Sequence, residues 1–148
     1  RRGCATTRDF HVGLAVAAES GLTVAVLGKA QGLSLAQIVE QSKALVEKAR
    51  AGKLSAEERQ HPTFTISNLG MYDIEHFEPI INWPSSITLG VASALPDTIV
   101  RDNTIVIGKT MGLTASCDHR ILDGATAASF FKDLKDLLEN PDELLKGQ

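Results

Sequence analysis

The sequence predicts an α+β fold in which helices cover one face of a mixed or antiparallel β-sheet. Runs of β-branched and apolar residues follow one another with short polar breaks, which is typical of adjacent strands. Only two segments repeat apolar residues at helical spacing, one in the middle of the chain and one near its C-terminus. The 148 residues match the length of one domain, and no repeat or long linker indicates a second.

The first strand pair is expected near the N-terminus. The run FHVGLAVAA at residues 10–18 has the composition of a strand, and Glu19-Ser20-Gly21 follows it as a turn. The run LTVAVL at residues 22–27 supplies a second strand. These features predict a β-hairpin.

An amphipathic helix is expected after this hairpin. Ser34 is suited to be its N-cap, and Gly52 follows the last apolar position as a stop signal. Glu40 and Lys43 fall on the polar side, and residues 51–62 have the composition of a loop. The apolar stripe consists of Leu35, Ile38, Val39, Leu45, Val46 and Ala49.

The second half of the chain is expected to be rich in strands. Asp102 and Asn103 favour a tight hairpin turn, and residues 71–84 show no regular period. Strands are expected at residues 63–67, 86–94, 98–101, 104–107 and 111–117.

A second helix is expected from about Ala125 to Asn140, where Pro141 ends it. Its buried stripe is expected to consist of Phe130, Phe131, Leu134, Leu137 and Leu138.

Charge and composition exclude several classes of function. The net charge of −3 offers no basic field for a nucleic acid, and no apolar run approaches the roughly 20 residues of a membrane-spanning helix. Cys4 and Cys117 form no C-x-x-C motif, so we expect a reducing compartment: the cytoplasm, or the mitochondrial matrix in a eukaryote. Residues 1–9 are expected to be an N-terminal tail.

The common site motifs are absent from the sequence. None of the four histidines pairs with another at i,i+4, so no metal site is expected. The glycines form neither G-x-G-x-x-G nor a Walker pattern, and no Gly-x-Ser-x-Gly elbow occurs.

The segment Asp118-His-Arg-Ile-Leu-Asp-Gly124 lies between a predicted strand and a predicted helix. Such a junction can hold a side chain rigidly at a cleft, and a histidine can accept a proton at neutral pH. Alternatively, Asp118 and Arg120 form a surface ion pair, Asp123 caps the helix, and His119 has no role. The local pattern alone favours this alternative.

A second candidate is Ser67, at the end of the strand in Thr65-Ile-Ser-Asn-Leu-Gly70. A hydroxyl in this position can donate to a developing oxyanion. Alternatively, it is an ordinary turn serine that bonds its own backbone, and this alternative is also favoured by the local pattern.

Taken together, these segments resemble the catalytic domain of the dihydrolipoyl acyltransferases, the core subunits of 2-oxo acid dehydrogenase complexes. The histidine motif alone is also similar to that of chloramphenicol acetyltransferase. The matches run in family order from about Phe10 to the C-terminus. They are VGLAV at 12–16 with Gly21-Leu22, EKAR at 47–50, FTISNLG at 64–70, IIN at 80–82 and DHRILDG at 118–124.

The resemblance implies a chloramphenicol acetyltransferase-like fold that forms trimers, and a larger cubic or icosahedral core built from them. It implies transfer of an acyl group between a dihydrolipoyl thioester and coenzyme A, with a lipoyl domain and other complex subunits as partners. The run of small residues at 124–128 is most similar to the acetyl-transferring branch of the family, which favours acetyl as the acyl group. The alternative is a structural core or partner-binding subunit that has the fold without turnover.

Roles for individual residues also follow from the resemblance. His119 is implied as the general base and Ser67 of a neighbouring subunit as the oxyanion donor. Asp123 is assigned an orienting or structural role, with an ion pair to Arg120 as one form of it and a helix cap as another.

The remaining positions near the motif receive lesser roles. Asn82 is expected in the loop that shapes the lipoyl or acyl side of the channel, with structural support of that loop as the alternative, and Gly124 is expected to contact a substrate. Asp118 and Arg120 are expected to support the site. Trp83 is expected in core or interface packing, with a ligand contact as the alternative, and Cys117 is expected as a small buried residue.

The sequence departs from the family in several places. The family's N-terminal portion has no counterpart, so residues 10–148 are interpreted as the C-terminal part of the catalytic domain. His61-Pro62 replaces the usual glycines, Ala25 stands where proline is common, and Trp83 with Ser85-Ser86 alters the loop after the Ile-Ile-Asn match. We expect these substitutions to affect pocket shape and acyl choice.

Overall fold

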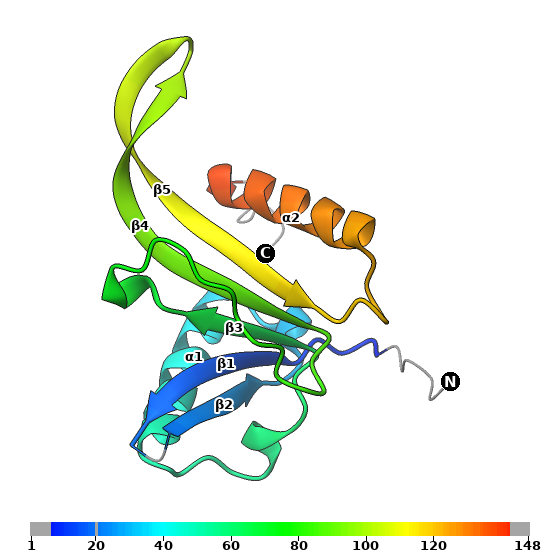
Figure 1. Cartoon of the computed structure of the whole chain (residues 1–148). Helices are drawn as coiled ribbons and strands as arrows, with labels where there is room; N and C mark the ends of the chain where they lie inside the picture. The colour runs from blue at the N-terminus through cyan, green and yellow to red at the C-terminus, as the bar shows by residue number, and fades with distance from the viewer. Residues whose placement is uncertain (1–6, 20, 143–148) are drawn as a thin grey trace.

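The computed structural model describes residues 7–19 and 21–142, in which five strands form one mixed sheet in the order β2-β1-β3-β4-β5 (Figure 1). The β1–β2 and β4–β5 pairs are antiparallel, whereas β3 lies parallel to both β1 and β4. The predicted α+β class with a mixed sheet is confirmed. The strands are β1 (Val12–Ala18), β2 (Gly21–Leu27), β3 (Phe64–Asn68), β4 (Ile87–Arg101) and β5 (Thr104–Cys117).

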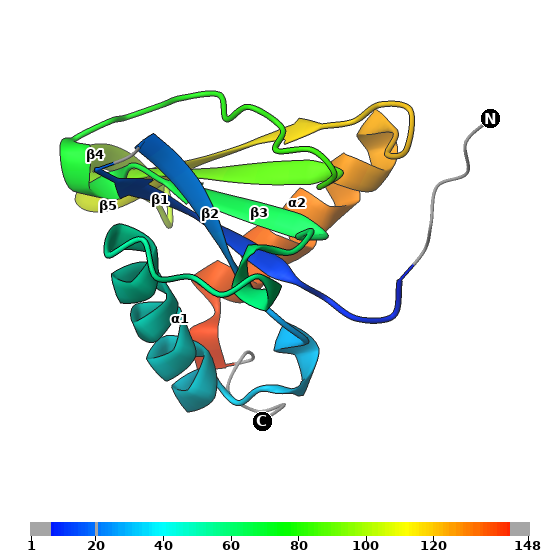
Figure 2. The ribbon, with the colours of Figure 1, turned by 90° about the horizontal axis from the view of Figure 1, so that it is seen from below.

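The helices α1 (Leu35–Arg50) and α2 (Gly124–Glu139) lie on the same side of the sheet (Figure 2). The irregular connection between β3 and β4 crosses the opposite face. There the Thr114 hydroxyl donates to the Phe77 carbonyl at 2.6 Å, and the Ser116 hydroxyl donates to the Pro79 carbonyl. Neither helix is long and apolar enough to cross a membrane, and the same holds throughout the described residues.

The capping signals predicted for α1 are confirmed at both ends. The Ser34 hydroxyl accepts from the Gln37 amide at 3.3 Å, and the Gln37 side chain accepts from the Ser34 amide at 2.9 Å. At the other end Gly52 has a φ of 68°, which glycine adopts without steric cost. The Lys53 amide then bonds the Lys48 carbonyl at 2.8 Å, closing the helix with a Schellman turn.

The core lies between α1 and the first two strands. It forms because the apolar stripe of α1 and one apolar face of the β1–β2 hairpin bury each other from water. The predicted hairpin is confirmed, but Leu35 and Val39 at the start of the stripe are exposed. The core cluster consists of Val16, Ala25, Leu27, Leu45, Ala49 and Leu54.

The expected breaks within β4 and β5 were wrong, because both strands are continuous around the turn. Pro96 lies inside β4, where β5 is the neighbour, whereas β3 pairs only with Thr88–Val91. A proline is tolerated there because no partner needs its missing N–H on the open side. Asp102 and Asn103 have φ values of 50° and 57°, as the predicted tight turn requires.

The expected burial of the α2 stripe was also wrong. Phe130, Leu137 and Leu138 are exposed, Phe131 and Leu134 are half-buried, and no described residue of α2 is buried. The Phe130 ring meets the Phe64 ring of β3 edge to face, with 5.9 Å between the ring centroids. The stripe of α2 is therefore left largely open in the single chain.

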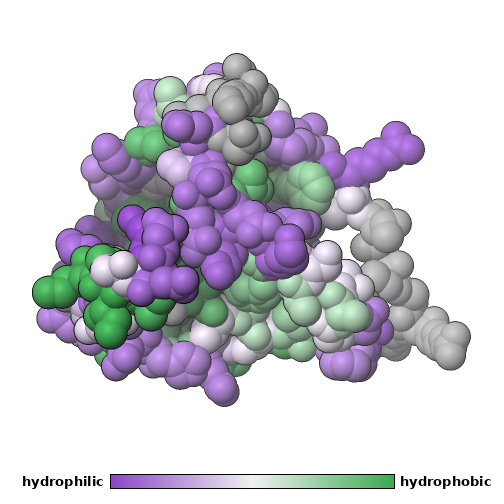
Figure 3. Space-filling model, turned by 90° about the horizontal axis from the view of Figure 1, so that it is seen from above, coloured by the Kyte–Doolittle hydropathy of each residue, from purple (hydrophilic) through white to green (hydrophobic). Residues whose placement is uncertain are grey.

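Other large apolar side chains also reach the surface (Figure 3). Trp83 is 79% exposed, so the prediction that it packs in the core was wrong for the single chain, and interface packing and a ligand contact stay open for it. Further exposed apolar residues are Met71, Tyr72 and Ile80 in the β3–β4 connection, and Val100, Ile105 and Ile107 in the β4–β5 hairpin.

The capping box gives a test of the fold. We expect Ser34→Ala to lower the free energy of unfolding by about 1 kcal/mol, because the Gln37 amide loses the hydroxyl that accepts its hydrogen bond. Denaturant unfolding measures the change. Ser129→Ala, at an exposed position within α2, is the matched control and is expected to leave stability unchanged. Equal stability of the Ser34 and Ser129 variants would contradict the assigned cap.

Candidate active site

His119 stands at the junction between β5 and α2, in a backbone held by several hydrogen bonds. The Asp118 amide donates to the Ser86 carbonyl at 2.9 Å, tying the end of β5 to the start of β4. The amides of Ile121 and Leu122 both donate to the Asp118 carbonyl, at 2.9 and 3.0 Å. The His119 side chain is exposed. The junction is therefore fixed while the imidazole remains accessible.

Asp118 and Arg120 form a bidentate ion pair beside this histidine. The Arg120 Nε lies 2.9 Å from Asp118 Oδ1, and Arg120 Nη2 lies 2.6 Å from Oδ2. The pairing lowers the pKa of Asp118 to about 2. Arg120 therefore pairs with Asp118, and the alternative ion pair between Arg120 and Asp123 was wrong, because the guanidinium fork is already occupied.

Asp123 is the N-cap of α2. Its Oδ1 accepts from the Thr126 amide at 2.8 Å, and its Oδ2 accepts from the Thr126 hydroxyl at 3.1 Å. The backbone bond from Thr126 is the main reason why the pKa of Asp123 lies below its usual value, and the charge of His119 is the weakest of the causes. Asp123, four residues after His119, thus fixes the start of α2 at Gly124.

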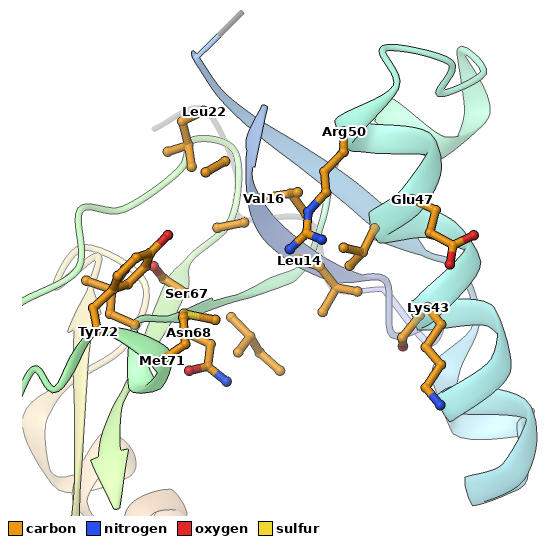
Figure 4. Close-up of a pocket in the computed structure, with 16 residues that line it drawn as sticks. Leu14, Val16, Leu22, Lys43, Glu47, Arg50, Ser67, Asn68, Met71 and Tyr72 are labelled. Atoms are coloured by element: carbon orange, nitrogen blue, oxygen red, sulfur yellow. The ribbon is translucent and has the colours of Figure 1, made fainter. Parts of the chain in front are cut away.

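Ser67 lies near the end of β3 and is one of the residues that line an open groove of about 780 Å³ beside α1, β1 and β3, and its hydroxyl points toward Tyr72, on the side away from α1 (Figure 4). Its hydroxyl makes no hydrogen bond with any described residue, so the alternative of a serine that bonds its own turn does not apply. The turn is instead closed by the Asn68 side chain, which accepts from the Gly70 amide at 2.8 Å. Ser67 is half-buried and free to bind another molecule.

The strand register separates Ser67 from His119 within one chain. Ser67 is in register with Gly90, and Gly90 pairs with Thr114 of β5. His119 lies beyond the end of β5. Measured along the strands, Ser67 and His119 are therefore separated by at least about 10 Å, and measured across the sheet, two strand spacings separate them by about another 10 Å. The β3 and β5 arrowheads point to opposite ends of the sheet (Figure 1). No hydrogen bond can join these side chains within one copy.

Asn82 lies at the same end of the sheet as His119. Its amide donates to the Thr88 hydroxyl at 3.4 Å, its carbonyl accepts from the Ser85 amide at 2.9 Å, and the same loop continues to Ser86, which binds Asp118. Gly124 opens α2 nearby, and a Cβ added there would meet nothing within 4 Å. The structure therefore groups Asn82, His119 and Gly124, and places Ser67 elsewhere.

The remaining predicted positions have simpler surroundings. Cys117 is half-buried, and this burial raises the pKa of its thiol. Cys4 lies outside the described residues. Among the residues that the structure describes, no three or more His, Cys, Asp or Glu side chains gather as a metal site would require.

Sequence reasoning did not identify several residues that line the Ser67 groove. Arg50 and Tyr72 face it from α1 and from the turn after β3. The helical spacing of Lys43, Val46, Glu47 and Arg50 was a usable signal, because these positions share one side of a helix. The strands that this side of the helix faces depend on tertiary packing, which the local spacing does not predict.

Comparisons with known proteins converge on one family. The model of the 2-oxoacid dehydrogenases acyltransferase catalytic domain matches residues 3–146. The dihydrolipoyllysine-residue acetyltransferase component of the acetoin cleaving system of Bacillus subtilis is 40% identical over 140 residues, which are 95% of this chain and 35% of that protein. The acetyltransferase component of the mitochondrial pyruvate dehydrogenase complex of Schizosaccharomyces pombe is 42% identical, over 93% of this chain and 29% of its own. This chain thus spans about a third of the length of these curated relatives.

Solved structures give the same result. The dihydrolipoamide acetyltransferase of Azotobacter vinelandii superposes with a TM-score of 0.91 at 35% identity, covering 97% of this chain and 59% of that one. The cubic core of a pyruvate dehydrogenase multienzyme complex superposes with a TM-score of 0.88 at 37% identity, covering 94% and 57%. The chain therefore has the chloramphenicol acetyltransferase-like fold.

The Azotobacter vinelandii enzyme was investigated for the roles of one serine, one histidine and one asparagine in its catalytic mechanism. In that protein the serine and histidine are 52 positions apart, and the asparagine follows the histidine by four. Ser67 and His119 are also 52 positions apart, and Asp123 follows His119 by four.

The Asp118–Arg120 pair predicts a particular dependence on pH. Because the folded-state pKa of Asp118 is about 2 and its ordinary value is 3.8, the pair contributes stability above pH 3.8 that is lost as the pH falls toward 2. We expect a carbon-detected NMR titration of the Asp118 carboxyl to show this low pKa, and Arg120→Gln to raise it. Arg101→Gln in the distant hairpin is the control. An unchanged Asp118 titration in the Arg120 variant would contradict the pairing.

Proposed function

Because the chain belongs to the catalytic-domain family of the 2-oxoacid dehydrogenase acyltransferases, we propose that it transfers an acyl group between a dihydrolipoyl thioester and coenzyme A. The observation that carries the proposal is the pair His119 and Ser67, both accessible and spaced as in the Azotobacter vinelandii enzyme. Acetyl is the favoured acyl group. The Bacillus subtilis and Schizosaccharomyces pombe relatives are acetyltransferase components, and residues 124–128 are small.

The chemistry is an exchange of one thioester for another. A free thiol is only a few per cent ionised at neutral pH, so a base that removes its proton accelerates the attack. In the proposed step, His119 takes the proton of the coenzyme A thiol as the sulfur attacks the acyl carbon. The carbon–sulfur bond to the lipoyl group then breaks, and His119 returns the proton to the departing dihydrolipoyl sulfur.

Ser67 is proposed to stabilise the intermediate of this exchange. Attack on the thioester carbonyl places a negative charge on its oxygen, and a fixed hydroxyl donor lowers the energy of that oxyanion. The Ser67 hydroxyl suits this role because it has no hydrogen-bond partner among the described residues and lies in an open groove. A serine occupied by its own turn would first have to break that bond.

The site is proposed to form between two copies of the chain, in a homotrimer. The strand register that separates His119 from Ser67 within one copy supports this arrangement, because the Ser67 hydroxyl that approaches the imidazole has to come from a neighbouring copy. Exposed apolar residues in the β3–β4 connection and the β4–β5 hairpin supply surfaces for such contacts. The similarity to a cubic core supports assembly of trimers into a larger shell.

The other predicted residues take supporting roles in this proposal. Asn82 and Gly124 lie beside the His119 junction, on the side where one substrate enters. Asp123 acts by holding the start of α2. Residues 10–148 are proposed to be the C-terminal part of the catalytic domain, with a lipoyl domain and other complex subunits as partners.

Single substitutions test the two roles. In an assay that couples acetyl-coenzyme A to free dihydrolipoamide, we expect His119→Ala to lower kcat by about 10²–10⁴-fold and Ser67→Ala by about 10²–10³-fold. Light scattering is expected to show unchanged assembly. His76→Ala, on the exposed part of the β3–β4 connection, is the matched control. Equal activity of His119→Ala and the unsubstituted protein would refute the catalytic assignment, and no turnover by the folded unsubstituted protein would favour a structural subunit.

Mixing the two inactive variants tests whether the site is shared. If subunits of His119→Ala and Ser67→Ala are unfolded and reassembled together in equal amounts, about a quarter of the interfaces recover both groups. We expect the corresponding return of activity. Mixtures that stay as inactive as the separate variants, although they co-assemble, would place the site within one chain.

A further inference from the structure

Residues 74–86 of the β3–β4 connection, here called the strap, are bound to the sheet at several points. The strap crosses the face of the sheet opposite α1 and α2 (Figure 2). At one end the Ser93 amide donates to the Ile74 carbonyl at 2.8 Å, and at the other the Asp118 amide donates to the Ser86 carbonyl at 2.9 Å. The strap contains no helix or strand of its own, so its contacts with the sheet have to fix its course.

Two glycines of the sheet allow the strap to lie directly on the strands. A Cβ atom added to Gly112 would come within 2.8 Å of the Glu75 carbonyl oxygen. A Cβ atom added to Gly90 would come within 3.0 Å of Phe77 and 3.1 Å of Pro79. Larger residues at these two positions would push the strap away from the sheet. The close approach brings carbonyl groups of the strap within reach of short hydroxyl side chains on β5.

The strand β5 supplies two such hydroxyls, from Thr114 and Ser116. The Thr114 hydroxyl donates to the Phe77 carbonyl at 2.6 Å, and the Ser116 hydroxyl donates to the Pro79 carbonyl. The two side chains are two positions apart in one strand and therefore share the face that the strap covers. Pro79 is buried, so its carbonyl group is costly to leave without a hydrogen-bond partner.

The bond between Ser116 and Pro79 joins the two segments that meet at the His119 junction. Ser116 precedes His119 by three positions along β5, and Pro79 precedes Asn82 by three positions along the strap. Asn82 itself is held by a long bond, in which its amide donates to the Thr88 hydroxyl at 3.4 Å. A shift of Pro79 would consequently move Asn82 relative to the imidazole.

On these grounds we propose that Thr114 and Ser116 are positioning residues, which act through the strap to hold Asn82 in a fixed place beside His119. The inference rests on the proposed function and deepens it, because it assigns control of one channel wall to hydroxyls that touch no substrate. In the proposed function the Asn82 loop shapes the lipoyl or acyl side of the channel. Displacement of this loop therefore weakens binding of the dihydrolipoyl substrate and leaves that of coenzyme A unchanged.

Kinetic measurements on the assembled protein test this assignment. Ser116→Ala and Thr114→Val are each expected to raise the KM for dihydrolipoamide about 2- to 10-fold and to leave the KM for coenzyme A unchanged. Thr114→Ser keeps the hydroxyl and is expected to retain the KM values of the unsubstituted protein. Thr110→Val is the matched control, because the Thr110 hydroxyl lies on the same face of β5 but binds Asp97 at 3.1 Å within the hairpin.

Amide hydrogen exchange followed by mass spectrometry gives a readout that needs no turnover. Ser116→Ala is expected to speed exchange at residues 80–86 relative to Thr110→Val, because the strap opens locally when one of its bonds to β5 is lost. Exchange in α1 is expected to stay the same in both variants.

Four results would overturn the assignment. They are equal exchange at residues 80–86 in Ser116→Ala and Thr110→Val, an unchanged KM for dihydrolipoamide, an equal rise in both KM values, or a rise in Thr114→Ser as large as that in Thr114→Val. If the folded unsubstituted protein shows no turnover, the proposed function fails, and the exchange experiment still decides whether these hydroxyls hold the strap.

Discussion

The strand pairing of β3, β4 and β5 is the constraint on which the site depends. β3 and β4 run parallel, and the two-residue turn at Asp102 and Asn103 sends β5 back antiparallel to β4. Residues at the end of β3 and residues after β5 consequently lie at opposite ends of the sheet. A one-residue slip would turn the side chains of β3 to the other face, so Ser67 owes its groove to this register. A catalytic unit that needs both ends must therefore be built from more than one chain.

The junction at His119 shows why the structural and functional interpretations of its motif are compatible. Asp118 is occupied by Arg120, and Asp123 is occupied by the first turn of α2. Both carboxylates therefore position the backbone on either side of His119 and leave its imidazole without a fixed partner among the described residues. The ordinary helix-capping chemistry of the motif is thus compatible with an accessible histidine.

Local signals in the sequence were sufficient where the structure is determined by neighbouring residues. The cap at Ser34, the stop at Gly52 and the turn at Asp102 and Asn103 each depend on contacts within a few positions, and each was predicted. The continuity of β4 through Pro96 was not, since it depends on which edges are paired. The separation of Ser67 from Asn82 and His119 also requires the register of distant strands. The helical spacing of apolar residues predicts an apolar stripe on α2, but it does not predict whether other parts of the same chain bury that stripe.

The exposed apolar side chains connect stability to the proposed activity. In one copy, Phe130 and Leu138 of α2, Trp83 of the β3–β4 connection and Ile107 of the hairpin all reach the surface. Covering a side chain of this size contributes about 1.5–3 kcal/mol when burial is complete, so several together can hold subunits against the entropy cost of association. Trp83 lies in the same loop as Asn82, beside the His119 junction. A neighbour that buries this loop would also cover the exposed imidazole, so assembly and the exclusion of water from the reacting thioester would occur together.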